Sequence, residues 1–167
     1  MTNYWRQLAW NGIRLETPAQ WEVVQIGIRH LILEDEAGPV MEVKWGVVKG
    51  TFSHRTHLKR LASLQSRRNK ISVAEWILPP PWEAALADFE AGGFLWQSPA
   101  ASGRGAILFC SGCRTATLIQ FVGDSSVKRE KIFLAVLRSF RDHSRDGWLP
   151  WSIFDIRARL PQSLQLE

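Results

Sequence analysis

The chain has 167 residues, of which 46% are hydrophobic and 22% are charged, and its net charge is +5. This composition is ordinary for a globular protein, and the length suits one domain with a small appendage. No apolar run reaches the roughly 18 residues of a membrane-spanning helix, and the first residues lack the basic and apolar segments of a secretory signal. We therefore expect a cytoplasmic protein without a membrane span.

Short strands separated by turn signals fill the first third of the chain. Ile13 and Leu15 alternate with polar neighbours before a turn at Pro18. Residues 21–33 are rich in β-branched and aromatic types, and residues 40–48 continue the same pattern after a loop that contains glycine and proline. The connections are too short for crossovers, so we expect three sequential antiparallel strands.

The spacing of apolar residues becomes helical over residues 51–70. Either Thr51 or Ser53 is suited to cap the start of this helix. Residues 71–78 resemble a strand. Three consecutive prolines then end this strand and are expected to hold the following chain extended. A short helix is then expected within residues 82–90.

A second group of strands and a final helix follow. We expect strands at residues 94–97, 106–110 and 115–122, joined as a meander, and then a helix that ends near Phe140. Strands that come in runs rather than alternating with helices, and the lack of a G-x-G-x-x-G motif, argue against a βαβ nucleotide fold. The sequence therefore predicts an α+β domain, with helices packed on a largely antiparallel sheet.

Two short segments resemble the PsbP-like family. They are the motif P-x-x-W at Pro18–Trp21, which follows a short strand, and the end of the closing helix, "VLRSFR", at Val136–Arg141. The resemblance covers residues 10–142 in outline. It implies an α/β/α sandwich and a non-catalytic role in binding or assembly, and it offers no shared catalytic motif.

The pair Cys110 and Cys113 is the first candidate for chemistry. The intervening Ser-Gly favours a two-residue hairpin turn, with the cysteines facing each other as half a zinc site or as a redox dithiol. His54 and His57 lie on one helix face and offer the other half. Zinc fingers, however, usually place three to five residues between their histidines. The alternative is two half-buried cysteines and two helix-start histidines, with no metal or cofactor.

The basic stretch is the second candidate. No acidic residue lies between Glu42 and Glu75, so this region could meet a phosphate or another anionic ligand. At 100° per residue its helical cations fan around the whole polar arc, which is typical of a solvated face, and no RNA-binding or DNA-binding motif accompanies them. We therefore do not favour a nucleic-acid partner, and binding of nucleic acid or of another anionic ligand through residues 44–70 is the alternative function. The cations concerned are Arg55, Lys59, Arg60, Arg67 and Arg68.

Nine tryptophans are a further unusual feature of the composition. Large aromatics within strand patterns are usually core residues. Those at residues 21, 45, 76 and 96 are therefore expected to be buried. Trp82, Trp148 and Trp151 flank prolines or loops, and we expect an exposed surface there.

Catalytic motifs are lacking. There is no G-x-S-x-G, no H-E-x-x-H and no P-loop, so no catalytic residue is assigned. The leading interpretation is a non-catalytic binding or assembly module. An enzyme would need a pocket with perturbed titrating groups.

The last residues repeat the pattern of the first strand. A shift of 143 positions places Ile13 on Ile156 and Pro18 on Pro161. We therefore expect one domain over residues 1–147, and over 148–167 a linker and a strand that opens a second similar domain; chance similarity is the alternative. Such a strand should dock on an open sheet edge, in the same molecule or in a neighbour. The expected partner is another protein, or a second copy of this chain bound through the C-terminal strand.

Overall fold

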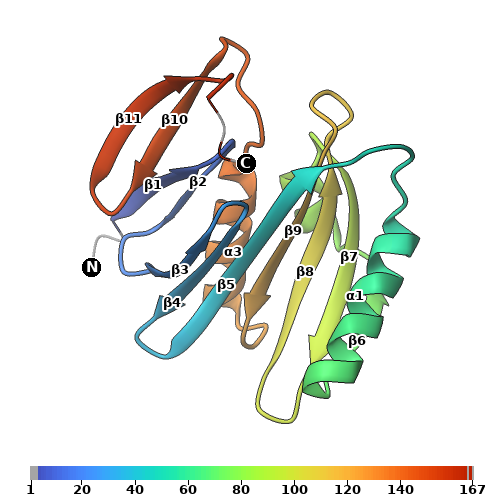
Figure 1. Cartoon of the computed structure of the whole chain (residues 1–167). Helices are drawn as coiled ribbons and strands as arrows, with labels where there is room; N and C mark the ends of the chain where they lie inside the picture. The colour runs from blue at the N-terminus through green and yellow to red at the C-terminus, as the bar shows by residue number, and fades with distance from the viewer. Residues whose placement is uncertain (1–3, 165, 167) are drawn as a thin grey trace.

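The computed structural model describes residues 4–164 and 166. Two antiparallel sheets and three helices make up the described part of the chain (Figure 1). The strands are β1 (Trp5–Trp10), β2 (Ile13–Pro18), β3 (Glu22–Gly27), β4 (His30–Asp35), β5 (Gly38–Val47), β6 (Ser72–Trp76), β7 (Glu90–Gln97), β8 (Ser102–Phe109), β9 (Thr115–Val122), β10 (Trp148–Ile153) and β11 (Ile156–Pro161). The helices are α1 (His54–Asn69), α2 (Pro80–Ala85) and α3 (Val127–Ser139).

The larger sheet has the strand order β3-β4-β5-β9-β8-β7-β6, and the smaller has the order β11-β10-β1-β2. Every neighbouring pair is antiparallel. Helices α1 and α3 lie on opposite faces of the larger sheet (Figure 1). The predicted α+β fold, with helices packed on a largely antiparallel sheet, is confirmed.

One hairpin of the larger sheet differs from the prediction. Residues 21–33 are not one strand, because a turn at Ile28 and Arg29 divides them into β3 and β4. The side chains of Trp10 and Asn11 donate hydrogen bonds to the carbonyls of Gly27 and Ile28, at 2.8 and 2.9 Å. A long-range contact therefore holds this turn, and the local pattern could not reveal it.

Local capping signals determine the helix starts. The Ser53 hydroxyl accepts a hydrogen bond from the Thr56 amide, which confirms one of the two predicted caps of α1. Pro80 and Pro81 do not hold the chain extended, but instead form the first turn of α2. Proline fits there because the amides of a first helical turn have no acceptor within the helix, so its missing N–H costs no hydrogen bond.

Among the described residues, no helix is long and apolar enough to cross a membrane.

An aromatic cluster joins α2 and α3 to the larger sheet. The Phe121 ring stacks on Phe133 of α3, with centroids 4.2 Å apart, and meets Trp82 of α2 edge-on at 6.0 Å. Trp21 packs against both phenylalanines. Trp82 is fully buried, so the expected exposed surface at this residue is wrong: the prolines that precede it turn its indole into the core.

The C-terminal strands join the N-terminal hairpin. Strand β10 pairs with β1 through Ala9 and Ser152, and β11 pairs with β10 along its length. The Trp151 ring meets the Trp10 ring edge-on, with centroids 4.8 Å apart. The C-terminal segment thus docks on a sheet edge in the same molecule. That it opens a second domain stays a prediction, as does self-association through β11, the outermost strand.

Replacing Leu149 tests whether β10 belongs to this core. The Leu149 side chain is only 3% exposed, whereas Ile156 on the paired strand is 70% exposed. We expect Leu149→Ala to lower the free energy of unfolding by about 2–3 kcal/mol, because it leaves a cavity. Ile156→Ala is the matched control and should cost less than about 0.5 kcal/mol. Equal urea midpoints for the two variants would contradict the packing of β10 described above.

Candidate metal centre

A tight turn between β8 and β9 carries the two cysteines. The Cys110 amide donates to the Thr115 carbonyl at 3.0 Å, and the Arg114 amide donates to the Cys110 carbonyl at 2.8 Å. Arg114 closes the turn in the left-handed region, at a φ of 59°. Four residues, 111–114, separate Cys110 from its backbone partner Thr115, so the predicted two-residue turn is wrong. Cys113 lies within this loop, and its sulfur is still within 4.8 Å of the Cys110 sulfur.

A second segment approaches this turn from the end of α3. Phe140 ends the helix, and Arg141 then pairs with Arg14 of β2 through two reciprocal backbone hydrogen bonds of 2.9 and 2.8 Å. This bridge fixes the path of the chain as it leaves the helix. The next two residues are Asp142 and His143, and they lie beside the cysteines.

The four side chains offer donor atoms that all lie within 4.8 Å of one another. Cys110 Sγ is 3.6 Å from His143 Nδ1, and Cys113 Sγ is 3.3 Å from Asp142 Oδ2. The His143 Nδ1 also lies 2.8 Å from Asp142 Oδ1. Two sulfurs, one imidazole nitrogen and one carboxylate thus converge from segments about 30 residues apart.

Burial makes the electrostatics of this cluster unusual. The Asp142 side chain is only 2% exposed, whereas the His143 side chain is 39% exposed. The pKa of the Cys113 thiol is raised to about 12, mainly by burial and further by the charge of Asp142. Hydrogen bonds with Thr115 lower this pKa but do not offset the effect of burial. Without a cation, the Cys113 thiol therefore keeps its proton at neutral pH.

The donor set matches zinc in type, and two of its contacts match zinc in spacing. Zinc holds sulfur at about 2.3 Å and nitrogen or oxygen at about 2.0–2.2 Å, so tetrahedral donors stand about 3.3–3.8 Å apart. The observed contacts of 3.6 and 3.3 Å already fall in this range. Two thiols with one imidazole favour zinc over the hard cations that prefer oxygen ligands. Small side-chain movements would complete the coordination.

A cysteine–histidine nucleophile fits this geometry poorly. In such a triad the histidine uses one ring nitrogen for the nucleophile and the other for the acid. Here both Cys110 and Asp142 face Nδ1 of His143. Cys110 is also buried, and the thiol pKa of Cys113 is raised rather than lowered. Metal binding therefore explains the cluster better than nucleophilic catalysis does.

The structure does not bring the predicted histidines to the cysteines. His54 Nε2 lies 3.0 Å from the Glu90 carbonyl, and His57 Nδ1 lies 3.0 Å from the Ser53 carbonyl. Both rings pack on Phe52. Asp142 and His143 join the cysteines instead. Sequence spacing gave no sign of this, because long-range contacts such as the Arg14–Arg141 bridge determine the path of the second segment.

The cations of α1 lie on its solvent side where the structure describes them. Arg55, Lys59 and Arg60 are exposed, whereas the side chains of Arg67 and Arg68 lie outside the described part. The exposure of these three side chains agrees with the solvated helix face that the spread of the cations around the helix axis predicts. Whether any of them binds an anionic ligand stays a prediction at this point.

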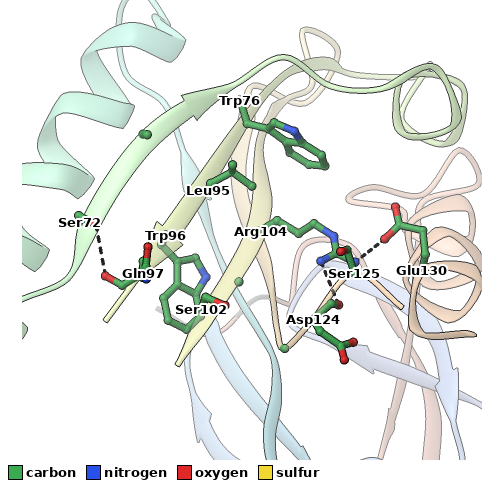
Figure 2. Close-up of a pocket in the computed structure, with 13 residues that line it drawn as sticks. Ser72, Trp76, Leu95, Trp96, Gln97, Ser102, Arg104, Asp124, Ser125 and Glu130 are labelled. Atoms are coloured by element: carbon green, nitrogen blue, oxygen red, sulfur yellow. Dashed lines mark hydrogen bonds and ion pairs between the residues drawn. The ribbon is translucent and has the colours of Figure 1, made fainter. Parts of the chain in front are cut away.

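A separate open groove lies between β6–β8 and the start of α3 (Figure 2). At its base, the buried Arg104 guanidinium pairs with the Glu130 carboxylate and donates to the Asp124 carbonyl at 3.1 Å. The Glu130 carboxylate also accepts a hydrogen bond from the Trp82 indole. Internal partners thus satisfy the Arg104 charge, so this network serves the fold rather than a ligand.

No protein-family model matches the chain, and no curated protein matches it. A fold alone does not define a function. What the protein does is therefore inferred from the residues of its own sites.

The Arg104–Glu130 network gives a test of stability. Glu130→Ala leaves the buried guanidinium without its carboxylate and the Trp82 indole without its acceptor. We expect a loss of about 3 kcal/mol in the free energy of unfolding, because an uncompensated buried charge is costly. Lys131→Ala, at the exposed neighbouring position, should change it by less than about 0.5 kcal/mol. If both variants melt alike, the ion pair is not a structural support.

Proposed function

We propose that this protein is a non-catalytic binding or assembly module that holds one structural zinc ion. The ligands are Cys110, Cys113, Asp142 and His143. The ion ties the β8–β9 turn to the segment that leads from α3 into β10. In this role the metal stabilises the surface of the module rather than transforming a substrate.

One observation carries the proposal: the four donor atoms converge within 4.8 Å although they come from separate segments. The burial of Asp142 supports it further. A carboxylate that is 2% exposed requires charge compensation, and the exposed His143 supplies that only when it is protonated. A divalent cation supplies it at every pH at which the thiols can ionise.

The number of protein donors supports a structural rather than a catalytic role. Catalytic zinc sites use three protein ligands and leave one position for water or substrate. This centre offers four protein donors, so a zinc ion that all four bind has no open position. The proposal therefore agrees with the lack of catalytic motifs in the sequence.

The thiols also bear on where the protein works. Cys110 and Cys113 are both free, and a zinc site needs them reduced. Reducing compartments keep such pairs as thiols, whereas secreted proteins oxidise them. We therefore propose that the protein acts in the cytoplasm.

Metal analysis of the purified protein tests the ligand set. We expect one zinc per chain, and His143→Ala should lose most of it because a donor is missing. His57→Ala is the matched control: it removes the histidine that the sequence suggests, and it should keep one zinc. Inductively coupled plasma mass spectrometry gives both values. Zinc-free wild-type protein after expression with added zinc, or a disulfide in its place, would contradict the proposal.

The reactivity of Cys113 gives a test that depends on pH. In the metal-free fold its raised pKa of about 12 keeps the thiol protonated at pH 8, whereas an unfolded cysteine has a pKa of about 8.5. We expect iodoacetamide to alkylate Cys113 at least tenfold more slowly in the fold than in urea at pH 8. The folded rate should climb between pH 9 and 12, because only the thiolate reacts.

Site-resolved mass spectrometry measures these two rates. Zinc should block alkylation of Cys113 at every pH tested, because the bound thiolate is no longer a free nucleophile. Fast alkylation of the folded, metal-free protein at pH 7 would show an activated thiol and would favour redox chemistry instead.

A further inference from the structure

A basic groove lies on the face of the larger sheet opposite α3. Its walls are β5 with the segment that follows it and the first turns of α1, and its floor lies on β9. Two small residues, Gly46 on β5 and Ala116 on β9, are among its lining positions. The groove has a volume of about 550 Å³, which is enough for a small ligand.

The side chains around the groove are basic or neutral. Lys44, Lys49 and Arg60 line it, and no aspartate or glutamate is among its described lining residues. Within the described part of the chain, neither Lys49 nor Arg60 forms an ion pair. Two uncompensated cations therefore face one cavity, on a chain whose net charge is already +5.

The carboxylate that pairs with Lys44 has several other partners. Glu42 lies 2.7 Å from Lys44 Nζ and 2.7 Å from His30 Nε2, and it accepts a hydrogen bond from Gln120. Burial opposes its ionisation, but these bonds, led by that of Lys44, hold the pKa of the Glu42 carboxyl below its ordinary value. Glu42 thus balances Lys44 and leaves the charges of Lys49 and Arg60 uncancelled.

Hydroxyl groups complete the lining. Thr51, Ser53 and Thr56 all border the groove. The Thr56 hydroxyl donates to Ser53 Oγ at 3.2 Å, so the Ser53 hydroxyl proton is left to donate elsewhere. Cations together with hydroxyl donors are the usual partners of phosphate oxygens.

Contacts with the β8–β9 turn hold the wall of the groove in place. The Val48 amide donates to the Arg114 carbonyl at 2.8 Å, and the Arg114 side chain donates to the Gly50 carbonyl. Phe52 stacks on Phe109, with centroids 4.5 Å apart and planes inclined by 8°. Lys49 and Thr51 therefore stand on a braced segment, which lowers the entropy cost of binding a ligand.

We propose that this groove binds the phosphate groups of an anionic ligand, with Lys49 and Arg60 as the principal contacts. Two aromatic rings line the groove. Trp45 is 9% exposed and donates its indole N–H to the Asn11 carbonyl, and the His57 ring packs on Phe52 with its Nδ1 3.0 Å from the Ser53 carbonyl. Both rings thus already have partners within the fold. The groove therefore recognises phosphate and not the base attached to it.

The test titrates pyrophosphate into the full chain at low salt, with isothermal titration calorimetry. We expect saturable binding that Lys49→Ala and Arg60→Ala each weaken about tenfold, since each removes a charge-assisted contact. Lys59→Ala is the matched control: it removes an adjacent cation of α1 that lies outside the groove, and its affinity should stay within twofold of the wild type.

Two further ligands distinguish the source of the phosphate. ADP that binds no tighter than pyrophosphate, with no binding of a single-stranded RNA 12-mer, indicates a small phosphorylated ligand. RNA binding that pyrophosphate competes away, and that Arg60→Ala weakens, indicates backbone phosphates. The proposal is overturned if neither pyrophosphate nor RNA binds at low salt, or if Lys59→Ala weakens binding as much as Arg60→Ala.

The groove contains no zinc donor, so the two proposals fail separately. Zinc content is measured on the same preparations. A zinc-loaded protein that ignores pyrophosphate overturns the phosphate groove alone, and a zinc-free protein that binds pyrophosphate overturns the metal centre alone.

Discussion

Two reciprocal backbone hydrogen bonds between Arg14 and Arg141 join the end of α3 to β2. The core requires this helix to lie across the larger sheet, where Phe133 stacks on Phe121. The bridge then turns the emerging chain toward the smaller sheet. This sheet combines the N-terminal strands β1 and β2 with the C-terminal strands β10 and β11. Asp142 follows directly, so its place beside the cysteines is a consequence of how the helix is packed.

Local signals predicted the parts of the fold that local forces determine. Ser53 caps α1, and the apolar alternation of residues 115–122 gives β9. The two cysteines lie close to each other, but in a four-residue loop rather than across the predicted two-residue turn. The first strand was missed, although Asn11-Gly12 is a strong hairpin signal, with φ values of 40° and 101°. The division into two sheets and the return of β10 to β1 depend on long-range pairing, which no local pattern reports. Kinship with the PsbP-like family stays a prediction.

The candidate site divides in the same way. Sequence spacing identified Cys110 and Cys113 but paired them with His54 and His57, because those two histidines share a helix face. The structure places Asp142 and His143 there instead. The Asp-His dipeptide carries no recognisable ligand spacing relative to the cysteines, so only the three-dimensional path of the chain reveals the set. Arg60 belongs to the basic region that the sequence shows, and the structure adds that it lines a groove.

The β8–β9 turn links the two proposed sites. Its two cysteines belong to the metal cluster, and its Arg114 forms hydrogen bonds with the segment that makes the wall of the basic groove. The central claim is the metal centre. X-ray absorption at the zinc edge of the purified protein tests it most directly, since it counts the sulfur atoms around the metal. The account predicts two sulfurs at about 2.3 Å and two nitrogen or oxygen atoms at about 2.0–2.2 Å. A shell of oxygen and nitrogen alone, without sulfur, would contradict it.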